Sequence, residues 1–370
     1  MRPVFILGRR HDEAGCAAAA ALVTEQGIPM TWHNLLPAGK LPNAVLDQLL
    51  HGLTRPDPRL LVGPQVGVDA AVIDFGATCL VAKTDPITFA TDAIGWYAVN
   101  VNANDIAVMG ATPRWFMATV LLPVGQATPA LAQSIFEQIG AACAALQVTP
   151  AGGHTEITTG LDRPIVAGVM LGETTRERLL SAAGVQPGDD LVLIGSVPIE
   201  GTALIAREKA AELAARGLDA ELVRRAQGFL HQPGISVVGA AHLAAQAVPL
   251  HALHDPTEGG LATGIWEMAR AAGVGMAVDF DAVAIAPESA ALCAAFDLDP
   301  LGVIASGALL AACAAEDTAA LLKACRAADL PAARIGRAGE RGGALQARRG
   351  GQPIAYPHFA VDEIARLFAV

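Results

Sequence analysis

The most informative stretch of this chain is Asn102-Ala103-Asn104-Asp105-Ile106-Ala107-Val108-Met109-Gly110-Ala111-Thr112-Pro113. It places one carboxylate and two side-chain amides in an otherwise apolar segment that is predicted to be helical. A carboxylate that is buried without a compensating partner is costly. We therefore expect Asp105 to face a metal ion or a polar cleft.

This stretch ends a helix that the sequence predicts for residues 92–109. The helix has a start signal at Thr91, a glycine suited to a left-handed cap at Gly110, and Pro113 beyond it. The amides and the carboxylate therefore lie in its C-terminal half.

Two further aspartates stand at the junctions of predicted elements. Asp69, in Gly67-Val68-Asp69-Ala70-Ala71, precedes an apolar run, and Asp85, in Thr84-Asp85-Pro86, ends another. Isolated aspartates at such junctions are the pattern expected when oxygen ligands gather around Mg²⁺ and phosphate.

Composition limits the class of protein. The 370 residues are 53% hydrophobic, which is enough for two domains, each with its own core. The 25 basic and 36 acidic residues give a net charge of −11, which argues against a broad nucleic-acid-binding surface. Six cysteines occur singly with no C-x-x-C pair, so the sequence predicts neither a zinc site nor a disulfide framework, but core residues in a reducing cytoplasm.

No membrane or targeting segment is predicted. The charged run Arg9-Arg10-His11-Asp12-Glu13 interrupts the only N-terminal candidate for a signal peptide. No window reads as the roughly 18 uncharged apolar residues that span a bilayer.

The chain is predicted to be α+β and to divide into four parts. These are an N-terminal extension and linker (1–60), a first domain (61–178), a second α+β domain (179–350) and a C-terminal tail (351–370). In the extension we expect strands at 4–7 and 28–32 and helices at 14–26 and 43–53. In the first domain we expect strands at 71–75, 80–83, 115–122 and 165–171, and helices at 92–109 and 129–146. In the second domain we expect strands at 191–195 and 303–312, and helices at 201–216, 236–247 and 257–272.

A glycine pair follows the second of these helices, in Gly152-Gly153-His154-Thr155-Glu156. Paired glycines let backbone N–H groups approach an anion, and the neighbouring hydroxyl and imidazole add donors. We interpret the segment as a loop between helix and strand that could bind phosphate, with an ordinary turn as the alternative.

A second glycine pair opens the helix predicted for 257–272, in Asp255-Pro256-Thr257-Glu258-Gly259-Gly260-Leu261. A helix N-terminus offers free N–H groups to an anion, and Asp255 could hold a metal that bridges to it. The alternative is that Asp255 caps the helix and the glycines allow close packing.

Taken in order, these five segments resemble the family of aminoimidazole ribonucleotide synthetase, selenophosphate synthetase, thiamine-monophosphate kinase and the hydrogenase-maturation carbamoyl dehydratase. The resemblance covers roughly residues 60–345. It implies two α+β domains, a homodimer whose N-terminal domains share a β-barrel, and ATP with Mg²⁺ between the domains. It also implies phosphorylation of an oxygen atom of a small acceptor.

Carried over by position, the resemblance assigns Mg²⁺ ligands, phosphate-loop glycines and further cofactor contacts. The implied metal ligands are Asp69, Asp85, Asp105 and Asp255. The implied cofactor contacts are Asn104, Gly152, Gly153, Thr155, Gly259 and Gly260.

Two departures from the family pattern stand out. The family often has paired aspartates where this chain has Val68-Asp69, so one metal-binding carboxylate is missing. The maturation dehydratase modifies a cysteine at its own C-terminus, whereas this chain ends Ile364-Ala365-Arg366-Leu367-Phe368-Ala369-Val370. The tail resembles the end of an amphipathic helix that docks on the protein, with Ile364, Leu367 and Phe368 at helical spacing.

The leading hypothesis is an ATP- and Mg²⁺-dependent enzyme that transfers a phosphoryl group to a small acceptor, with Lys83 and His154 as candidate catalytic donors to the phosphates. A second hypothesis is a nucleotide-binding scaffold that has lost turnover through the change at Val68. A third is a dimer whose aspartates only cap helices. The sequence does not identify the acceptor, and it leaves Arg207, His231, His254 and Trp266 without an assigned role.

Overall fold

The computed structural model describes residues 22–23, 29–30, 36, 40–41, 43–51 and 55–368. Two short strands, β1 (Leu22–Val23) and β2 (Pro29–Met30), pair with each other. The predicted strand 28–32 is confirmed at β2, whereas β1 falls in the predicted helix 14–26, which is wrong at that point. The strand predicted for 4–7 lies outside the described residues. Helix α1 (Asn43–His51) confirms the helix predicted there.

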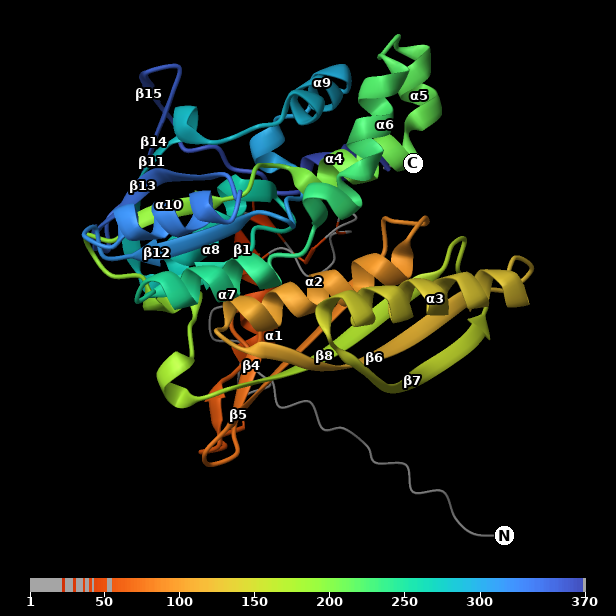
Figure 1. Ribbon diagram of the computed structural model, residues 1–370, viewed down its shortest axis with the longest axis horizontal. Coiled ribbons are helices and arrows are strands. Elements are labelled where there is room, and N and C mark those ends of the chain that lie inside the picture. The colour runs from red at the N-terminus through yellow and green to blue at the C-terminus, as the bar shows by residue number, and fades with distance from the viewer. Residues whose placement is uncertain are drawn as a thin grey trace, which may run out of the picture.

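The first domain is a six-stranded sheet with two helices on one face (Figure 1). Its strand order is β3-β4-β5-β8-β6-β7, which is antiparallel except for the parallel pair β6 and β7. The elements are β3 (Leu60–Val62), β4 (Ala71–Asp74), β5 (Cys79–Ile87), α2 (Ile94–Val108), β6 (Thr112–Pro123), α3 (Pro129–Leu146), β7 (Thr149–Thr158) and β8 (Ile165–Thr174).

Helix α3 forms as its sequence predicts. The Thr128 hydroxyl accepts a hydrogen bond from the N–H of Leu131, and Pro129 occupies the first turn, where its missing N–H costs nothing. Ile135, Ile139 and Ala142 recur at helical spacing on one side of α3 and are buried. This stripe fixes α3 against α2.

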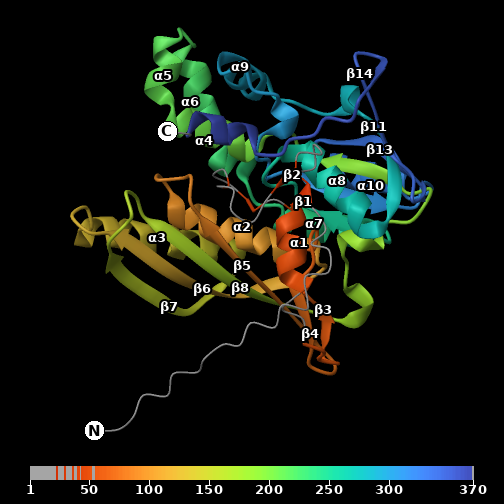
Figure 2. The same cartoon turned by 180° about the vertical axis from the view of Figure 1, so that it is seen from behind.

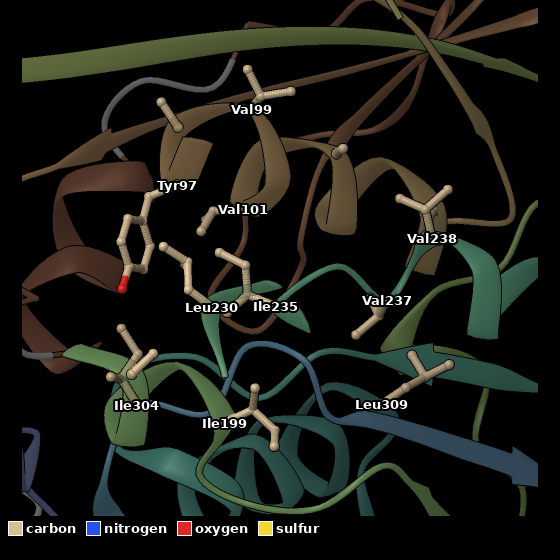
Figure 3. Packing of buried hydrophobic residues seen from close by; sticks show 14 of the residues in the cluster. Tyr97, Val99, Val101, Ile199, Leu230, Ile235, Val237, Val238, Ile304 and Leu309 are labelled. Carbon is tan, nitrogen blue, oxygen red and sulfur yellow. The ribbon is translucent and has the colours of Figure 1, made fainter. Parts of the chain in front are cut away.

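Helix α2 lies at the centre of the molecule. Every residue in it except Trp96 is buried. One side packs on β5 and β8 of the first sheet, and another packs on α7 (Val238–Ala247) and β10 (Ala252–His254) of the second domain. Figure 3 shows how side chains of α2, such as Tyr97 and Val101, meet Leu230, Ile235 and Ile304 of the second domain.

The second domain is built on a seven-stranded mixed sheet, of order β10-β12-β9-β13-β11-β14-β15. Its other strands are β9 (Asp190–Ile194), β11 (Val274–Asp279), β12 (Leu309–Cys313), β13 (Ala332–Arg341), β14 (Leu345–Arg349) and β15 (Gln352–Ile354). Its other helices are α4 (Ile199–Glu208), α5 (Ala210–Ala215), α6 (Ala220–Gly228), α8 (Gly260–Ala272), α9 (Pro287–Ala295) and α10 (Thr318–Ala327). Seen from behind, α1 passes beside this domain (Figure 2). Oδ2 of Asp47 on α1 lies 3.9 Å from a guanidinium nitrogen of Arg270 on α8.

Three predicted elements of this domain differ from the observed ones. The single helix predicted for 201–216 is two helices, α4 and α5, that join at Lys209. The helix predicted for 257–272 begins at Gly260, and the strand predicted for 303–312 begins at Leu309. At 201–216 and 303–312 apolar residues continue past the observed element, so sequence pattern alone does not locate the boundary. At 257–259 the residues are polar or glycine, and a turn at 258–259 precedes the helix.

The predicted loop at 152–156 is also wrong. These residues belong to β7, the edge strand of the first sheet, and pair in parallel with β6. Gly153 is needed there because a Cβ atom would lie 2.0 Å from the carbonyl oxygen of Ala118. The sheet is open within one chain, so the barrel expected from the resemblance is not closed by these strands alone.

The predicted docking of the tail is confirmed over the described residues. A short 3-10 helix, η6 (Glu363–Leu367), buries Ile364 completely. Among the described helices, none is long and apolar enough to cross a membrane.

Candidate active site between the two domains

A cavity of about 690 Å³ lies between the domains. Both domains and the segment before α1 contribute to its walls. Charged side chains concentrate in one part of it, from Lys40, Asp69, Lys83, Asp85, Asp105, His254 and Glu267.

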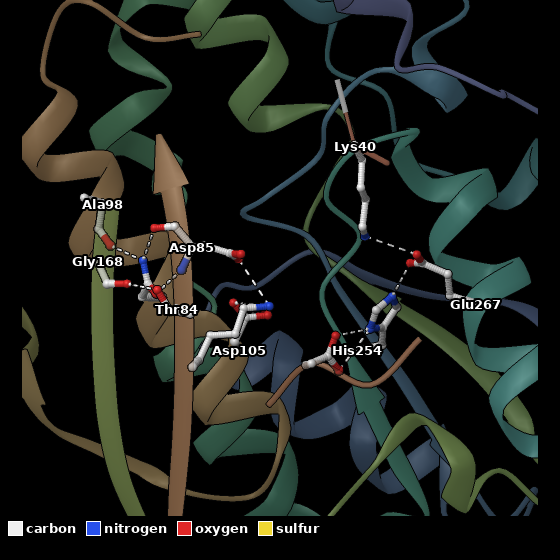
Figure 4. Close-up of polar contacts among 11 residues, drawn as sticks. Lys40, Thr84, Asp85, Ala98, Asp105, Gly168, His254 and Glu267 are labelled. Carbon is white, nitrogen blue, oxygen red and sulfur yellow. Dashed lines mark hydrogen bonds and ion pairs between the residues drawn. The ribbon is translucent and has the colours of Figure 1, made fainter. Parts of the chain in front are cut away.

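The first group of acidic residues surrounds His254, the last residue of β10. Ligand atoms of Asp69, His254 and Asp255 all lie within 4.8 Å of one another. Nδ1 of His254 is 3.0 Å from a carboxylate oxygen of Asp69, and Nε2 is 3.2 Å from Oε2 of Glu267 on α8. Oε1 of Glu267 is in turn 3.4 Å from Nζ of Lys40, as Figure 4 shows.

These contacts determine the charge of the imidazole. Burial lowers the pKa of His254, but the carboxylates of Asp69 and Glu267 raise it further, so that it lies well above its usual range. His254 therefore carries a positive charge and donates from both ring nitrogens.

Asp255 is the residue of this group whose polar atoms are unsatisfied. Both of its carboxylate oxygens are buried, and neither has a hydrogen-bond partner among the described residues. Burial, together with the charge of Asp69, raises its pKa. A buried, unpartnered carboxylate beside a second carboxylate is a donor set that fits a hard divalent cation. Asp255 does not cap α8, because the capping position is Gly259.

Lys83 sits between two other aspartates. Its Nζ lies 3.2 Å from Oδ2 of Asp85 and 3.3 Å from Oδ2 of Asp105. Lys83 and Asp85 share one side of β5 because residues two apart in a strand face the same way. Burial lowers the pKa of Lys83, and the carboxylates of Asp105 and Asp85 raise it above its ordinary value, so the ammonium stays charged.

Three polar residues in the C-terminal half of α2, Asn102, Asn104 and Asp105, have different roles. The amide of Asn102 bonds the backbone of Asp85 in both directions, at 2.9 and 3.2 Å, and so holds β5 against α2. The amide of Asn104 donates to the carbonyl of Ile235 and accepts from the N–H of Val237, both at 2.8 Å. Asp105 alone reaches the cavity.

Four of the residues predicted as metal ligands form two pairs. Asp69 and Asp255 are neighbours, and Asp85 and Asp105 share Lys83. The charges of Asp255, Asp85 and Asp69 all act on Asp105, whose pKa is raised mainly by burial.

Other predicted residues lie elsewhere. Asn104 was expected to contact the cofactor, but its amide joins the two domains instead. Residues Gly152, Gly153, His154 and Thr155 lie on the exposed edge strand β7, and none of them lines the cavity of its own chain.

The glycine pair at the start of α8 is already bonded within the chain. The N–H of Gly259 donates to Oδ2 of Asp362 at 2.6 Å, and that of Gly260 donates to the carbonyl of Thr257 at 3.0 Å. A Cβ at Gly260 would lie 2.5 Å from the carbonyl oxygen of Leu301. Close packing therefore accounts for Gly260.

Sequence reasoning missed several cavity residues. His254 precedes Asp255 directly, so its place beside a proposed metal ligand could have been inferred. Glu267 stands among apolar residues in the helix predicted for 257–272, so its sequence context resembles that of a core position. The sequence also did not indicate that Glu200, Tyr97 and Ser306 line the cavity, because each is an isolated polar residue among mainly apolar neighbours.

Comparison with known proteins agrees with this architecture. Residues 67–174 match the family described as AIR synthase related protein, N-terminal domain, and residues 186–347 match its C-terminal domain. The carbamoyl dehydratase HypE of Cupriavidus necator is 32% identical over 260 residues, which cover 70% of this chain and 71% of that protein. A selenide, water dikinase of Escherichia coli is 28% identical over 250 residues, covering 66% of this chain and 68% of that protein.

Solved structures show the same fold. E. coli HypE superposes with a TM-score of 0.65 at 22% identity, over 84% of this chain and 97% of that one. AaThiL, solved in complex with AMPPCP and TMP, gives a TM-score of 0.66 at 18% identity, over 85% and 96%. The resemblance inferred from the five segments is confirmed, and the chain belongs to the AIR synthase-related family.

Proposed function

We propose that this protein binds ATP with Mg²⁺ in the cavity between its domains and transfers a phosphoryl group to a small acceptor. The observation that carries the proposal is that Asp69, Asp85 and Asp105 line one cavity, with Asp255 directly behind Asp69 and His254 and lacking a hydrogen-bond partner among the described residues. The relatives support it, since HypE has been solved with ATP and AaThiL with AMPPCP.

A divalent cation would let these carboxylates accept a polyphosphate. Lys83 and His254 already pair with Asp85, Asp105 and Asp69, so the unpartnered Asp255 is the carboxylate that most needs a cation. Asp69, Asp85, Asp105 and Asp255 are the residues that would hold Mg²⁺, and the ion would supply positive charge to the phosphates. Lys83, already aimed into the cavity, donates to a phosphate oxygen and exchanges a carboxylate partner for it.

A non-catalytic, nucleotide-binding scaffold is the second candidate. Val68 lines the cavity beside Asp69, in the position where the family often has a second aspartate. Loss of that carboxylate would leave nucleotide binding and remove turnover. ATP consumption measured with a panel of acceptors separates the two candidates.

A reducing compartment such as the cytoplasm is proposed for this activity. The described cysteines, Cys79, Cys143, Cys293, Cys313 and Cys325, are all free and buried.

The test replaces Asp105 with asparagine, which keeps the shape and removes the charge. We expect Asp105→Asn to weaken Mg²⁺-dependent nucleotide binding roughly tenfold or more, or about 1.4 kcal/mol, when measured by calorimetry. Asp329→Asn is the matched control, because Asp329 is exposed and distant from the cavity lining. Equal affinity in Asp105→Asn and the control would remove Asp105 from the metal site.

A further inference from the structure

One face of the second sheet is left open by the described helices beyond β13. Helix α10 packs on β9 and β13, and β14 and β15 extend away from it (Figure 1, Figure 2). A cavity of about 660 Å³ lies here, lined only by residues of β11, β13, β14 and β15 and the two residues that follow β15. We call this surface the arginine face, after Arg334, Arg337 and Arg348, which line it.

A β-bulge brings two of these arginines to the same side of β13. Arg334 pairs with Val192 of β9 and Arg337 pairs with Asp190, and the register shifts between them. In a regular strand, residues three apart point to opposite faces. Because the bulge inserts one extra residue, Arg334 and Arg337 stand on one face, as far apart as two residues of β9, or about 7 Å.

Asp190 holds both arginines in place. Its Oδ1 forms ion pairs at 2.7 Å with Nε of Arg334 and at 4.0 Å with Nε of Arg337. Nε of Arg337 also donates to the carbonyl of Gly188 at 3.1 Å, and Oδ2 of Asp190 accepts from the hydroxyl of Thr318. Asp190 is buried, whereas the two arginine side chains are 46% and 53% exposed. Their terminal nitrogens donate no hydrogen bond to a described residue, so they are available to a ligand.

The other side of the arginine face carries Arg348 of β14. Between the two sides lies the exposed Ala277 of β11, which pairs with Arg337 on one side and with Gln346 on the other. Its small side chain leaves room above the sheet. Asp279 is the one acidic residue among those that line the face, and its Oδ2 lies 3.8 Å from Nε of Arg348. Three guanidinium groups therefore face one carboxylate, in a chain whose net charge is −11.

Charge and spacing indicate which ligand fits this surface. A guanidinium group binds a carboxylate through two parallel N–H donors. In an extended peptide, side chains at alternate positions point the same way and are about 7 Å apart. This spacing matches that of Arg334 and Arg337, so two carboxylates at alternate positions can pair with both arginines at once.

Nucleic acid fits the surface less well. Bases that lie on a sheet need exposed aromatic rings for stacking. The one aromatic residue that lines the face, Tyr356, packs on Phe280 and donates its hydroxyl to the carbonyl of Ala262. The net charge of the chain also repels a long polyanion.

We propose that the arginine face is a docking surface for an extended, acidic segment of a partner protein. Carboxylates at alternate positions of the segment pair with Arg334 and Arg337, and Arg348 adds a contact from the other side. The inference is independent of the proposed phosphoryl transfer, because none of the residues that line this face lines the cavity between the domains.

The experiment measures binding of two isomeric octapeptides, ETETETET and ETTEETTE, to the full-length protein by ligand-observed NMR. Both have capped ends and the same charge, but only the first has glutamates two positions apart. An octamer of thymidylate and citrate are the other probes. The variants are Arg337→Gln and Arg348→Gln. The control is Arg224→Gln, because Arg224 is also exposed and ion-paired, but on α6.

We expect ETETETET to bind the wild-type protein roughly threefold or more tightly than ETTEETTE. Arg337→Gln and Arg348→Gln should each weaken its binding roughly three- to fivefold, and Arg224→Gln should leave it unchanged. Arg337→Gln should also remove the preference between the isomers, whereas Arg348→Gln should keep it. Because the charges are exposed, added salt should weaken the binding. Thermal melting confirms that each variant is folded.

The proposal is overturned if neither peptide binds, if the isomers bind equally, or if Arg337→Gln and Arg348→Gln bind ETETETET as tightly as the wild-type protein does. Tighter binding of the thymidylate octamer would make the face a nucleic-acid surface instead. Full competition by citrate at an equal concentration of carboxylates would make it a site for small anions. Either of these results also overturns the proposal.

Discussion

The carboxylate of Asp362 accepts a hydrogen bond from the backbone N–H of Gly259, with 2.6 Å between Oδ2 and the nitrogen. Its other oxygen accepts from the N–H of Ile364 at 2.8 Å. The C-terminal segment thus supplies an internal anion at the start of α8, where the sequence predicts a phosphate-binding position. The tail and α8 are therefore held together next to the cavity.

The first prediction concerns this tail. Deleting residues 364–370 removes the fully buried Ile364 and should lower the free energy of unfolding by about 2–3 kcal/mol. Mg²⁺-dependent nucleotide binding should stay nearly intact, because the aspartates proposed as metal ligands lie on other elements. Urea unfolding and calorimetry measure the two effects. Loss of ATP turnover without loss of stability would instead make the tail a catalytic element.

The second prediction concerns the contact between the domains. Asn104→Ala leaves the carbonyl of Ile235 and the N–H of Val237 buried without their partner, and should destabilise the protein by about 2–4 kcal/mol. Asn100→Ala is the matched control, since its amide bonds only Trp96 of its own helix. Equal losses of stability in both variants would show that the bridge between domains contributes nothing.

The third prediction is a pH dependence of stability. Burial raises the pKa of Glu200 from 4.5 to about 8, so the folded state binds this proton more tightly than the unfolded state. That contribution is complete below about pH 4.5 and is lost as the pH rises to about 8. Glu200→Gln cannot lose a proton, so its stability relative to the wild-type protein should increase by about 2–4 kcal/mol between pH 5 and pH 8. If the difference in unfolding free energy between Glu200→Gln and the wild-type protein were the same at pH 5 and pH 8, the pKa of Glu200 would not be raised in the folded protein.

The fourth prediction is a homodimer. The uncovered face of the first sheet carries a row of paired residues, Ala82, Leu171 and Trp115, across β5, β8 and β6. From the resemblance, we expect the strand segments 80–83 and 115–122 to form a barrel shared by two chains. An exposed apolar face of this kind is removed from water when a second copy of the chain covers it. Light scattering at micromolar concentration should give the mass of a dimer, and Leu171→Lys should shift it toward the monomer. A monomer mass for the wild-type protein would contradict the prediction.

The sequence predicts those features of this protein that depend on residues close together in the chain. The caps and apolar stripe of α3 and the aspartates of the cavity were predictable, because spacing and an unsatisfied charge are visible within a few residues. The tasks of Asn104 and Gly259 were not, since their partners, Ile235 and Asp362, are more than one hundred residues away. The segment 152–156 was mistaken for a loop because Gly153 is needed for the close approach of neighbouring strands, which only the pairing with Ala118 reveals.

The burial of α2 on all sides has a consequence for work with fragments of this protein. The boundary at residue 178 separates two domains in the sequence, but α2 is covered by α7 and β10 from beyond that boundary. A fragment that ends there would expose one apolar side of its central helix to water and is expected to aggregate. The two domains are therefore expected to be stable only when they are produced as one chain.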